Sequence, residues 1–344
     1  MRRQLNTLYV TTDGSWLRKE GANVVLEVER EMRARMPLHM LESLVCFGRV
    51  AVSPQLLGHC MAQGVSISYL SPNGRFLARV EGPVSGNVLL RREQYRRSEE
   101  PVGCAAVVRN VLIGKVHNQH AVLARGWRDH GGDLSDTASF QHAIKRLKRI
   151  PRRLLEEPDV NVLRGLEGEA AQAYFGVFNQ LIRVDASKLQ FTTRNRRPPR
   201  DAVNALLSFL YTLLTHDCRS ALETVGLDPA VGFLHRDRPG RPSLALDLAE
   251  ELRPLLGERL ALSLINRKQL GEADFQHLDN GTVLLHDDAR KTVLIAYQER
   301  KREEVRHPFL DEKLPIGLLP HVQSQLLARH LRGDLDAYAP YLWK

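Results

Sequence analysis

The chain has 344 residues, of which 43% are hydrophobic and 26% charged, so it can bury a sizeable core in one or two domains. Its formal net charge of +9 favours a polyanionic partner, and its longest nearly apolar run, at residues 202–214, is too short to span a bilayer. The four cysteines form no C-x-x-C pair and are typical of reduced thiols. The N-terminus has no apolar stretch of the secretory kind, and we expect a cytoplasmic protein.

Residues 1 to about 80 favour β-strands, because β-branched or alternating runs are separated by turn signals at Asp13-Gly14 and at residues 72–74. One helix interrupts the strands, beginning at Ser53-Pro54 and ending before Gly64. The strands are expected at residues 8–12, 23–28, 44–47, 65–70 and 75–80.

The pattern changes at residues 82–86, after which long segments with a 3.6-residue period dominate. The prediction is an α+β fold with a small N-terminal β-sheet domain over residues 1–81, a linker over 82–86 and a larger all-α domain over 87–344. Within the larger domain, residues 202–214 predict a buried helix, and residues 282–285 are the one short run typical of a strand.

Two clusters of basic residues contain no acidic residue. One lies at residues 141–153 and the other at 189–200. A solvated charged face would explain either cluster alone, but two of them on either side of Glu167 in the sequence favour contacts with DNA phosphates. The candidate DNA-binding residues are Lys145, Arg146, Lys148, Arg149, Arg194, Arg196, Arg197 and Arg200.

Residues 159–181 predict an amphipathic helix. Glu167 falls at the edge of its apolar stripe, whereas Glu169 faces away. A half-buried carboxylate is costly unless it is paired or bound to a metal. The alternative to a metal is a salt bridge to Arg164, three residues earlier. The stripe consists of Leu163, Leu166, Ala170, Tyr174 and Val177.

A second acidic segment follows a loop that carries His235. Ser243 is predicted to be the N-cap of a helix that Pro254 ends, and on this helix Asp247 and Glu250 share one face. The loop would bring the imidazole back to that face. Carboxylates suit Mg²⁺ or Mn²⁺, and a single imidazole is compatible with Mn²⁺ in particular. The alternative is a solvated acidic helix face beside a loop histidine.

Other motifs give weaker evidence about function. His117 and His120 are three residues apart on a predicted helix, but without a nearby cysteine or carboxylate pattern they are better interpreted as surface residues than as metal ligands. The chain contains neither G-x-x-x-x-G-K-[ST] nor H-E-x-x-H. P-loop nucleotide hydrolysis and zinc-protease chemistry therefore have no support.

Three segments, at residues 163–175, 194–209 and 235–250, occur in an order and spacing typical of a known family. They resemble the first CRISPR adaptation protein, the integrase that inserts new spacers. Residues 307–310 and 317–324, together with residues 331–336, resemble the type I-C branch of that family. The resemblance covers nearly the whole chain.

The resemblance implies metal ligands at Glu167, His235 and Glu250, with Mg²⁺ or Mn²⁺ as the cofactor. Asp247 is then a further catalytic residue, which either binds the ion or orients one of the three ligands through a hydrogen bond. Many family members have Asp where this chain has Glu250, which keeps the charge and adds a methylene. Glu251 lies about 100° further round the helix and is not expected to reach the same ion.

The implied function is a metal-dependent DNA endonuclease and integrase, in which a DNA 3′-OH attacks a phosphodiester at a CRISPR repeat. The implied fold joins an N-terminal β-sheet domain to a helical catalytic domain. The implied partners are double-stranded DNA, a second copy of the chain bound through the β domain, the small ferredoxin-like second adaptation protein and an iron–sulfur exonuclease. Two alternatives stay open: a structure-selective nuclease for branched DNA that uses the same residues, and a DNA-binding scaffold whose acidic cluster is structural.

Overall fold

The computed structural model describes residues 6–72, 74, 76–80, 82, 88–184, 189–195 and 198–343. The chain forms two compact units. The first comprises residues 1–85 with residues 290–302, and the second comprises residues 86–289 with residues 303–344. The predicted α+β class, with an N-terminal β-sheet region followed by a mostly helical part, is confirmed.

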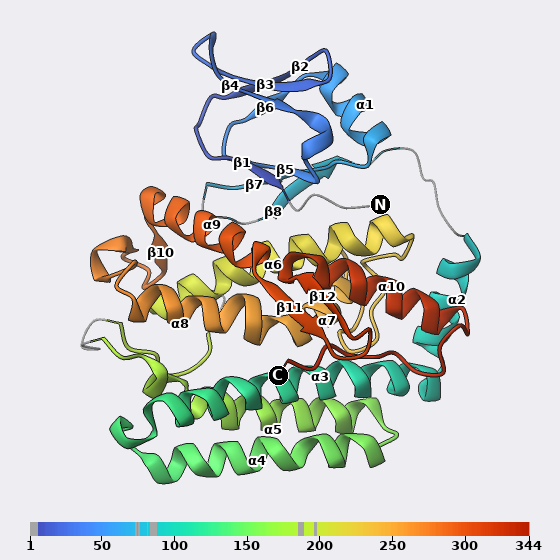
Figure 1. Cartoon of the computed structure of the whole chain (residues 1–344), viewed down its shortest axis with the longest axis vertical. Helices are drawn as coiled ribbons and strands as arrows, with labels where there is room; N and C mark the ends of the chain where they lie inside the picture. The colour runs from blue at the N-terminus through green and yellow to red at the C-terminus, as the bar shows by residue number, and fades with distance from the viewer. Residues whose placement is uncertain are drawn as a thin grey trace. The chain divides into compact units, whose positions relative to one another are not determined.

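The first unit contains two four-stranded sheets, which lie one above the other in Figure 1. One sheet has the order β4-β3-β2-β6, formed by Glu31–Pro37, Asn23–Val28, Trp16–Glu20 and Ala51–Val52. The other has the order β1-β5-β7-β8, formed by Thr7–Val10, Ser43–Phe47, Ser66–Leu70 and Phe76–Val80. In it β1, β5 and β7 run parallel and β8 is antiparallel to β7.

The core of the first unit is built from side chains of both sheets and of helix α1, such as Leu17, Leu44 and Leu56, which are all 0% exposed. Helix α1 (Pro54–Gln63) begins after Ser53, whose Oγ accepts from the Leu56 N–H, and ends at Gly64 in the left-handed region. The five predicted strands and this helix are therefore confirmed. The sequence analysis missed β2, β4 and β6, because β2 and β4 are rich in charged residues and β6 has two residues.

The helix expected at residues 159–181 is observed at 160–178, whereas the helix expected at residues 202–214 extends to Val225. Helices α3, α4 and α5 pack against one another, and α7 packs against both α3 and α6 (Figure 1). The helices are α2 (Val88–Glu99), α3 (Pro101–His130), α4 (Thr137–Glu156), α5 (Val160–Phe178), α6 (Ala202–Val225), α7 (Ser243–Leu252), α8 (Arg259–Asn266), α9 (Asp287–Arg302) and α10 (Leu319–Leu331). In the described part of the chain, no helix is long and apolar enough to cross a membrane.

The second unit is mostly helical but not entirely so. Its two short antiparallel pairs are β9 (Phe275–His277) with β10 (Val283–Leu285), and β11 (Glu304–His307) with β12 (Glu312–Pro315). The strand expected at residues 282–285 is thus confirmed as β10, whereas the other three strands were not predicted.

Two predictions about helix α7 were wrong. Ser243 is the first residue of the helix rather than its N-cap, and its Oγ donates to the Arg236 carbonyl at 3.2 Å. Pro254 does not end the helical path, because residues 253–258 continue as a π-helical turn into α8. Near the start of a new helical segment a proline is tolerated, since its missing N–H has no partner to lose there.

Candidate active site

Helix α5 presents Glu167 to the site. The helix begins after Asp159, whose Oδ1 accepts from the Asn161 N–H at 2.6 Å, and its predicted apolar stripe is buried. Glu167 lies beside that stripe with 30% of its side chain exposed. Its partner is not Arg164, which donates to the Leu234 carbonyl at 2.8 Å. The sequence-based alternative of an Arg164 salt bridge is therefore not what the structure shows.

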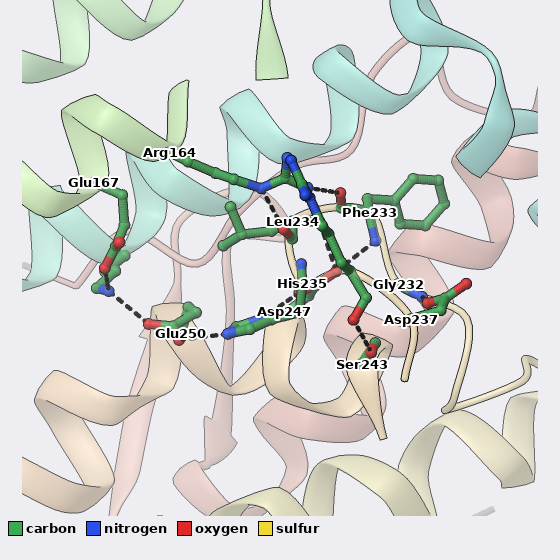
Figure 2. Close-up of polar contacts among 12 residues, drawn as sticks. Arg164, Glu167, Gly232, Phe233, Leu234, His235, Asp237, Ser243, Asp247 and Glu250 are labelled. Atoms are coloured by element: carbon green, nitrogen blue, oxygen red, sulfur yellow. Dashed lines mark hydrogen bonds and ion pairs between the residues drawn. The ribbon is translucent and has the colours of Figure 1, made fainter. Parts of the chain in front are cut away.

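His235 is held by Asp247, which is 1% exposed. The Asp247 carboxylate accepts the backbone N–H groups of Phe233, Leu234 and His235 at 2.7, 3.0 and 2.9 Å. Its Oδ1 also lies 2.6 Å from His235 Nδ1. One carboxylate thus folds the loop back onto helix α7 and fixes the ring, whose Nε2 lies 3.8 Å from Glu250 Oε1 (Figure 2).

Glu250 is the most buried of the candidate ligands, with 3% of its side chain exposed. Arg253 forms an ion pair with Oε1, and Lys115 lies 2.7 Å from Oε2. Burial disfavours the charged carboxylate, but Arg253 and then Lys115 outweigh that effect and lower the pKa of Glu250 to about 2. Glu250 is therefore ionised in the folded protein.

Lys115 on helix α3 is a residue of this site that the sequence analysis missed. Its ammonium is paired with Glu167 as well as with Glu250, and only 8% of its side chain is exposed. Burial opposes the charged form, but Glu250 and Glu167 outweigh it and raise the pKa of Lys115. A signal existed, because Lys115 is the one Lys, Arg, Asp or Glu between residues 110 and 124.

The donor set fits a divalent metal ion. Glu167 and Glu250 supply carboxylate oxygens, His235 supplies Nε2, and the Lys115 ammonium already stands in for a cation between the two carboxylates. Among the described residues, no three His, Cys, Asp or Glu side chains are yet arranged as a metal-binding group. In this arrangement Lys115 is paired with Glu167 and Glu250, and Arg253 is paired with Glu250.

A cavity of about 500 Å³ opens beside His235. Its wall combines aromatic and charged side chains from α2, α5 and the His235 loop, among them Tyr95, Arg164, Phe233 and Arg236. Cys104 also lines it, but burial raises the pKa of this thiol to about 11, so it is no ready nucleophile. All four cysteines are free and buried, in agreement with the prediction of reduced thiols.

The candidate DNA-binding residues of the first basic cluster, at 141–153, lie on helix α4. Lys145, Lys148 and Arg149 are exposed there. Arg146 is paired with Glu169 of helix α5 at 3.0 Å. A second cavity, of about 400 Å³, lies at this face and is lined by His142, Lys145, Arg146, Arg149, Arg153 and Glu169. Four Lys or Arg side chains against one carboxylate make this an anion-attracting surface.

The residues of the second basic cluster, at 189–200, differ in their surroundings. Arg194 donates to Asn204 Oδ1 at 2.7 Å, and its guanidinium lies 5.2 Å from the centre of the Tyr211 ring, so it is engaged within the unit. Arg200 is exposed and donates to the Asn280 carbonyl at 3.3 Å. The candidate DNA-binding residues Arg196 and Arg197 lie outside the described residues.

Glu251 points away from this site, as expected from its position on the helix. It is 0% exposed and accepts from the Tyr338 hydroxyl and, at 2.7 Å, from the Tyr341 N–H. Burial raises its pKa to about 7. His117 is half-buried rather than a surface residue, and its Nε2 lies 3.0 Å from the Trp343 carbonyl. These residues tie down the C-terminal segment.

The chain is similar to known proteins over most of its length. The model of the family described as CRISPR associated protein Cas1 matches residues 8–299. The chain is 61% identical over 347 residues to the CRISPR-associated endonuclease Cas1 2 of Rhodospirillum rubrum, with 100% of both chains covered. It is 35% identical over 338 residues to a CRISPR-associated exonuclease Cas4/endonuclease Cas1 fusion of Geobacter sulfurreducens, covering 97% of this chain and 60% of the relative.

A solved structure described as a Cas6-RT-Cas1–Cas2 complex has the same fold. It matches with a TM-score of 0.81 and 22% identity, covering 100% of this chain and 36% of that one. The family match spans most of the chain, and the identity to the Rhodospirillum rubrum relative extends over its full length. The chain therefore belongs to the CRISPR associated protein Cas1 family.

Proposed function

We propose that the protein is a metal-dependent DNA endonuclease and integrase that inserts new spacer DNA into a CRISPR array. The observation that carries this proposal is the convergence of Glu167, His235 and Glu250, which come from two helices and a loop, in a chain 61% identical to a Cas1 endonuclease. The type I-C-like branch is proposed from the closing segments at residues 307–310, 317–324 and 331–336.

We infer that Glu167, His235 Nε2 and Glu250 hold Mg²⁺ or Mn²⁺. A bound ion supplies Lewis acidity, which activates the attacking oxygen or stabilises charge on the phosphoryl group and the leaving 3′-oxygen. The protein contributes a preset donor geometry. Asp247 accepts a hydrogen bond from Nδ1 of His235, so the Nε2 lone pair faces the ion. Arg253 keeps the Glu250 carboxylate ionised.

In the proposed reaction, the 3′-oxygen of a donor strand forms a bond to phosphorus at the repeat boundary, and the bond from phosphorus to the target 3′-oxygen breaks. The attacking hydroxyl loses its proton and the leaving oxygen gains one from solvent. The cavity beside His235 offers room for the strand at this step. With water in place of the donor hydroxyl, the same site hydrolyses the phosphodiester.

We propose that DNA phosphates contact the exposed basic residues of helix α4, Lys145, Lys148 and Arg149, together with Arg146 at the adjoining cavity. Arg194, Arg196, Arg197 and Arg200 stay predictions for the second cluster. Of these, Arg194 is the weakest candidate, because its guanidinium already has partners within the unit.

We further propose a homodimer through the β domain, residues 1–81, joined by the linker at 82–86 to a catalytic domain over 87–344. The proposed partners are the second adaptation protein and an iron–sulfur exonuclease. One similar structure is that of a Cas6-RT-Cas1–Cas2 complex, and one relative is a Cas4 exonuclease fused to Cas1, which supports both proposals. A protein that acts on a CRISPR array works where the chromosome is, which supports a cytoplasmic location.

The test is half-site integration of a donor with a free 3′-OH into a repeat-bearing plasmid, with and without the second adaptation protein. Joined products that require Mn²⁺ or Mg²⁺ support the proposal. Cleavage of branched DNA without joining would support the alternative of a structure-selective nuclease. DNA binding that is equal with and without metal, and no products, would support a scaffold.

A further inference from the structure

The ammonium of Lys115 bonds the two carboxylates that the proposed metal ion would share. It is paired with Glu167 and lies 2.7 Å from Glu250 Oε2. An ion bonded at about 2.0–2.2 Å to Glu167 Oε1 and Glu250 Oε2, the two oxygens that face this ammonium, would occupy the same space as the ammonium. Two cations cannot occupy one position, so the metal and Lys115 exclude each other there.

Burial strengthens this exclusion. The Lys115 side chain is 8% exposed and that of Glu250 is 3% exposed, so water screens the charges weakly. In the metal-free protein Lys115 supplies the second of two positive charges, after Arg253, that balance the buried carboxylates. Removing its ammonium leaves the pair Glu167 and Glu250 with a net negative charge that a divalent ion can neutralise.

The backbone beneath Lys115 has little room to move. A Cβ placed on the preceding residue, Gly114, would lie 3.0 Å from Pro340 Cβ and 3.1 Å from Glu251 Cβ. Helix α3 is therefore packed tightly against helix α7 and the C-terminal segment at this point. When an ion enters, the flexible Lys115 side chain must give way, because the helix cannot.

We propose that Lys115 is an intramolecular competitor for the metal site: it holds Glu167 and Glu250 together in the metal-free protein and must leave them before an ion binds. The inference rests on the proposed ligand set. Lys115 thereby lowers the affinity for divalent ions and keeps the empty site folded. It is a positioning residue in the metal-free state, not a ligand.

The test is calorimetric titration of Mn²⁺ into the full-length, metal-free protein without DNA. Lys115→Met keeps the side-chain volume and removes the charge, and should bind Mn²⁺ on the order of tenfold more tightly than the unchanged protein. Lys115→Arg keeps the charge and should not bind more tightly. Lys313→Met, which removes an exposed lysine of the same unit, is the control and should bind as the unchanged protein does.

Weaker or unchanged Mn²⁺ affinity in Lys115→Met, or equal tightening in Lys115→Arg, would overturn the inference. If Lys115→Met folds poorly without metal, the test is thermal unfolding of this variant and of the unchanged protein, each with and without Mn²⁺. The metal-dependent rise in Tm should then be larger than in the unchanged protein, and a smaller rise would contradict us. The titration contains no DNA, so its result does not depend on integration. The proposed role of Lys115 and the proposed integrase function can therefore be contradicted independently of each other.

Discussion

Asp247 Oδ1 lies 2.6 Å from His235 Nδ1, and the same carboxylate accepts the N–H groups of three consecutive loop residues, 233–235. The carboxylate therefore orients both the ring and the loop that carries it. Nδ1 faces Asp247 and Nε2 faces Glu250, and the tautomer with its proton on Nδ1 directs the Nε2 lone pair toward Glu250. This is the orientation that an imidazole ligand requires.

Asp247→Asn should slow strand transfer about 10- to 100-fold, because one amide oxygen cannot replace two carboxylate oxygens that accept four hydrogen bonds. The loss should be smaller than that of Glu250→Gln and larger than that of Glu251→Gln, whose side chain faces the C-terminal segment. Initial rates at saturating Mn²⁺ measure the order. An unimpaired Asp247→Asn protein would show that the loop holds the ring without this carboxylate.

The C-terminal segment gives a prediction about stability. Tyr338→Phe removes the hydroxyl that donates to the buried Glu251 carboxylate, and should cost about 1–3 kcal/mol of unfolding free energy. Tyr95→Phe removes a hydroxyl bonded at 2.9 Å to Asp228 on the exposed surface, and should cost less than about 1 kcal/mol. Urea unfolding of the two proteins gives both numbers. Equal costs would mean that burial of Glu251 adds nothing to this contact.

His307 gives a prediction about pH. It is 0% exposed, its Nε2 lies 2.8 Å from Gln323 Oε1, and its Nδ1 accepts from the Leu310 N–H. Burial lowers the pKa of His307 below its ordinary value, so the unfolded chain takes up the proton first as pH falls. The stabilising contribution is therefore complete above about pH 6.5 and is lost as pH falls through the folded-state pKa.

His307→Gln should remove this part of the pH dependence. Unfolding free energies of the two proteins at pH 7.5 and 5 give the difference: the unchanged protein should lose more stability on acidification than the variant. Parallel losses would show that His307 does not titrate differently in the folded and unfolded states.

Helix α4 gives a prediction about DNA affinity. Replacing Lys145, Lys148 and Arg149 together with Gln should weaken binding to all sequences and flatten the slope of log K against log salt by roughly one unit for each lost phosphate contact. Replacing Lys268 and Lys313, which are exposed elsewhere in the unit, tests whether net charge alone is responsible. A slope that stays the same in the α4 variant would make this face a solvated surface.

The fold and the acidic part of the site follow from local patterns. The apolar stripe of residues 163–177 places Glu167 at its edge, and the spacing of Asp247 and Glu250 puts both on one helix face. These are properties of a single helix, and the structure agrees with them. The predictions for Ser243 and Pro254 failed because the helix begins at Ser243 with Pro242 in the N-cap position, and because a π-helical turn accommodates Pro254.

Lys115 could not be placed in the site from periodicity, because its partners Glu167 and Glu250 lie on other helices, whereas Arg253 pairs with Glu250 three residues earlier on the same helical path. Lys115 lies more than fifty residues before Glu167 and has no motif around it. Its one signal is a lone charge on a helix face that is otherwise buried, including Val111, Leu112 and Val116. A buried cation requires a counter-charge, but the sequence does not say which carboxylate supplies it.

The central claim is that Glu167, His235 and Glu250 form one metal-dependent site for 3′-OH attack. It is tested most directly by strand transfer with Mn²⁺, using a donor ending in a 3′-OH or a 3′-deoxy sugar, and comparing the unchanged protein with Glu167→Gln. Glu167 is suited to this because its side chain is 30% exposed, so its loss should perturb folding less than loss of buried Glu250. We predict joined product only for the unchanged protein with the 3′-OH donor and metal; joining by folded Glu167→Gln at the unchanged rate would contradict the account.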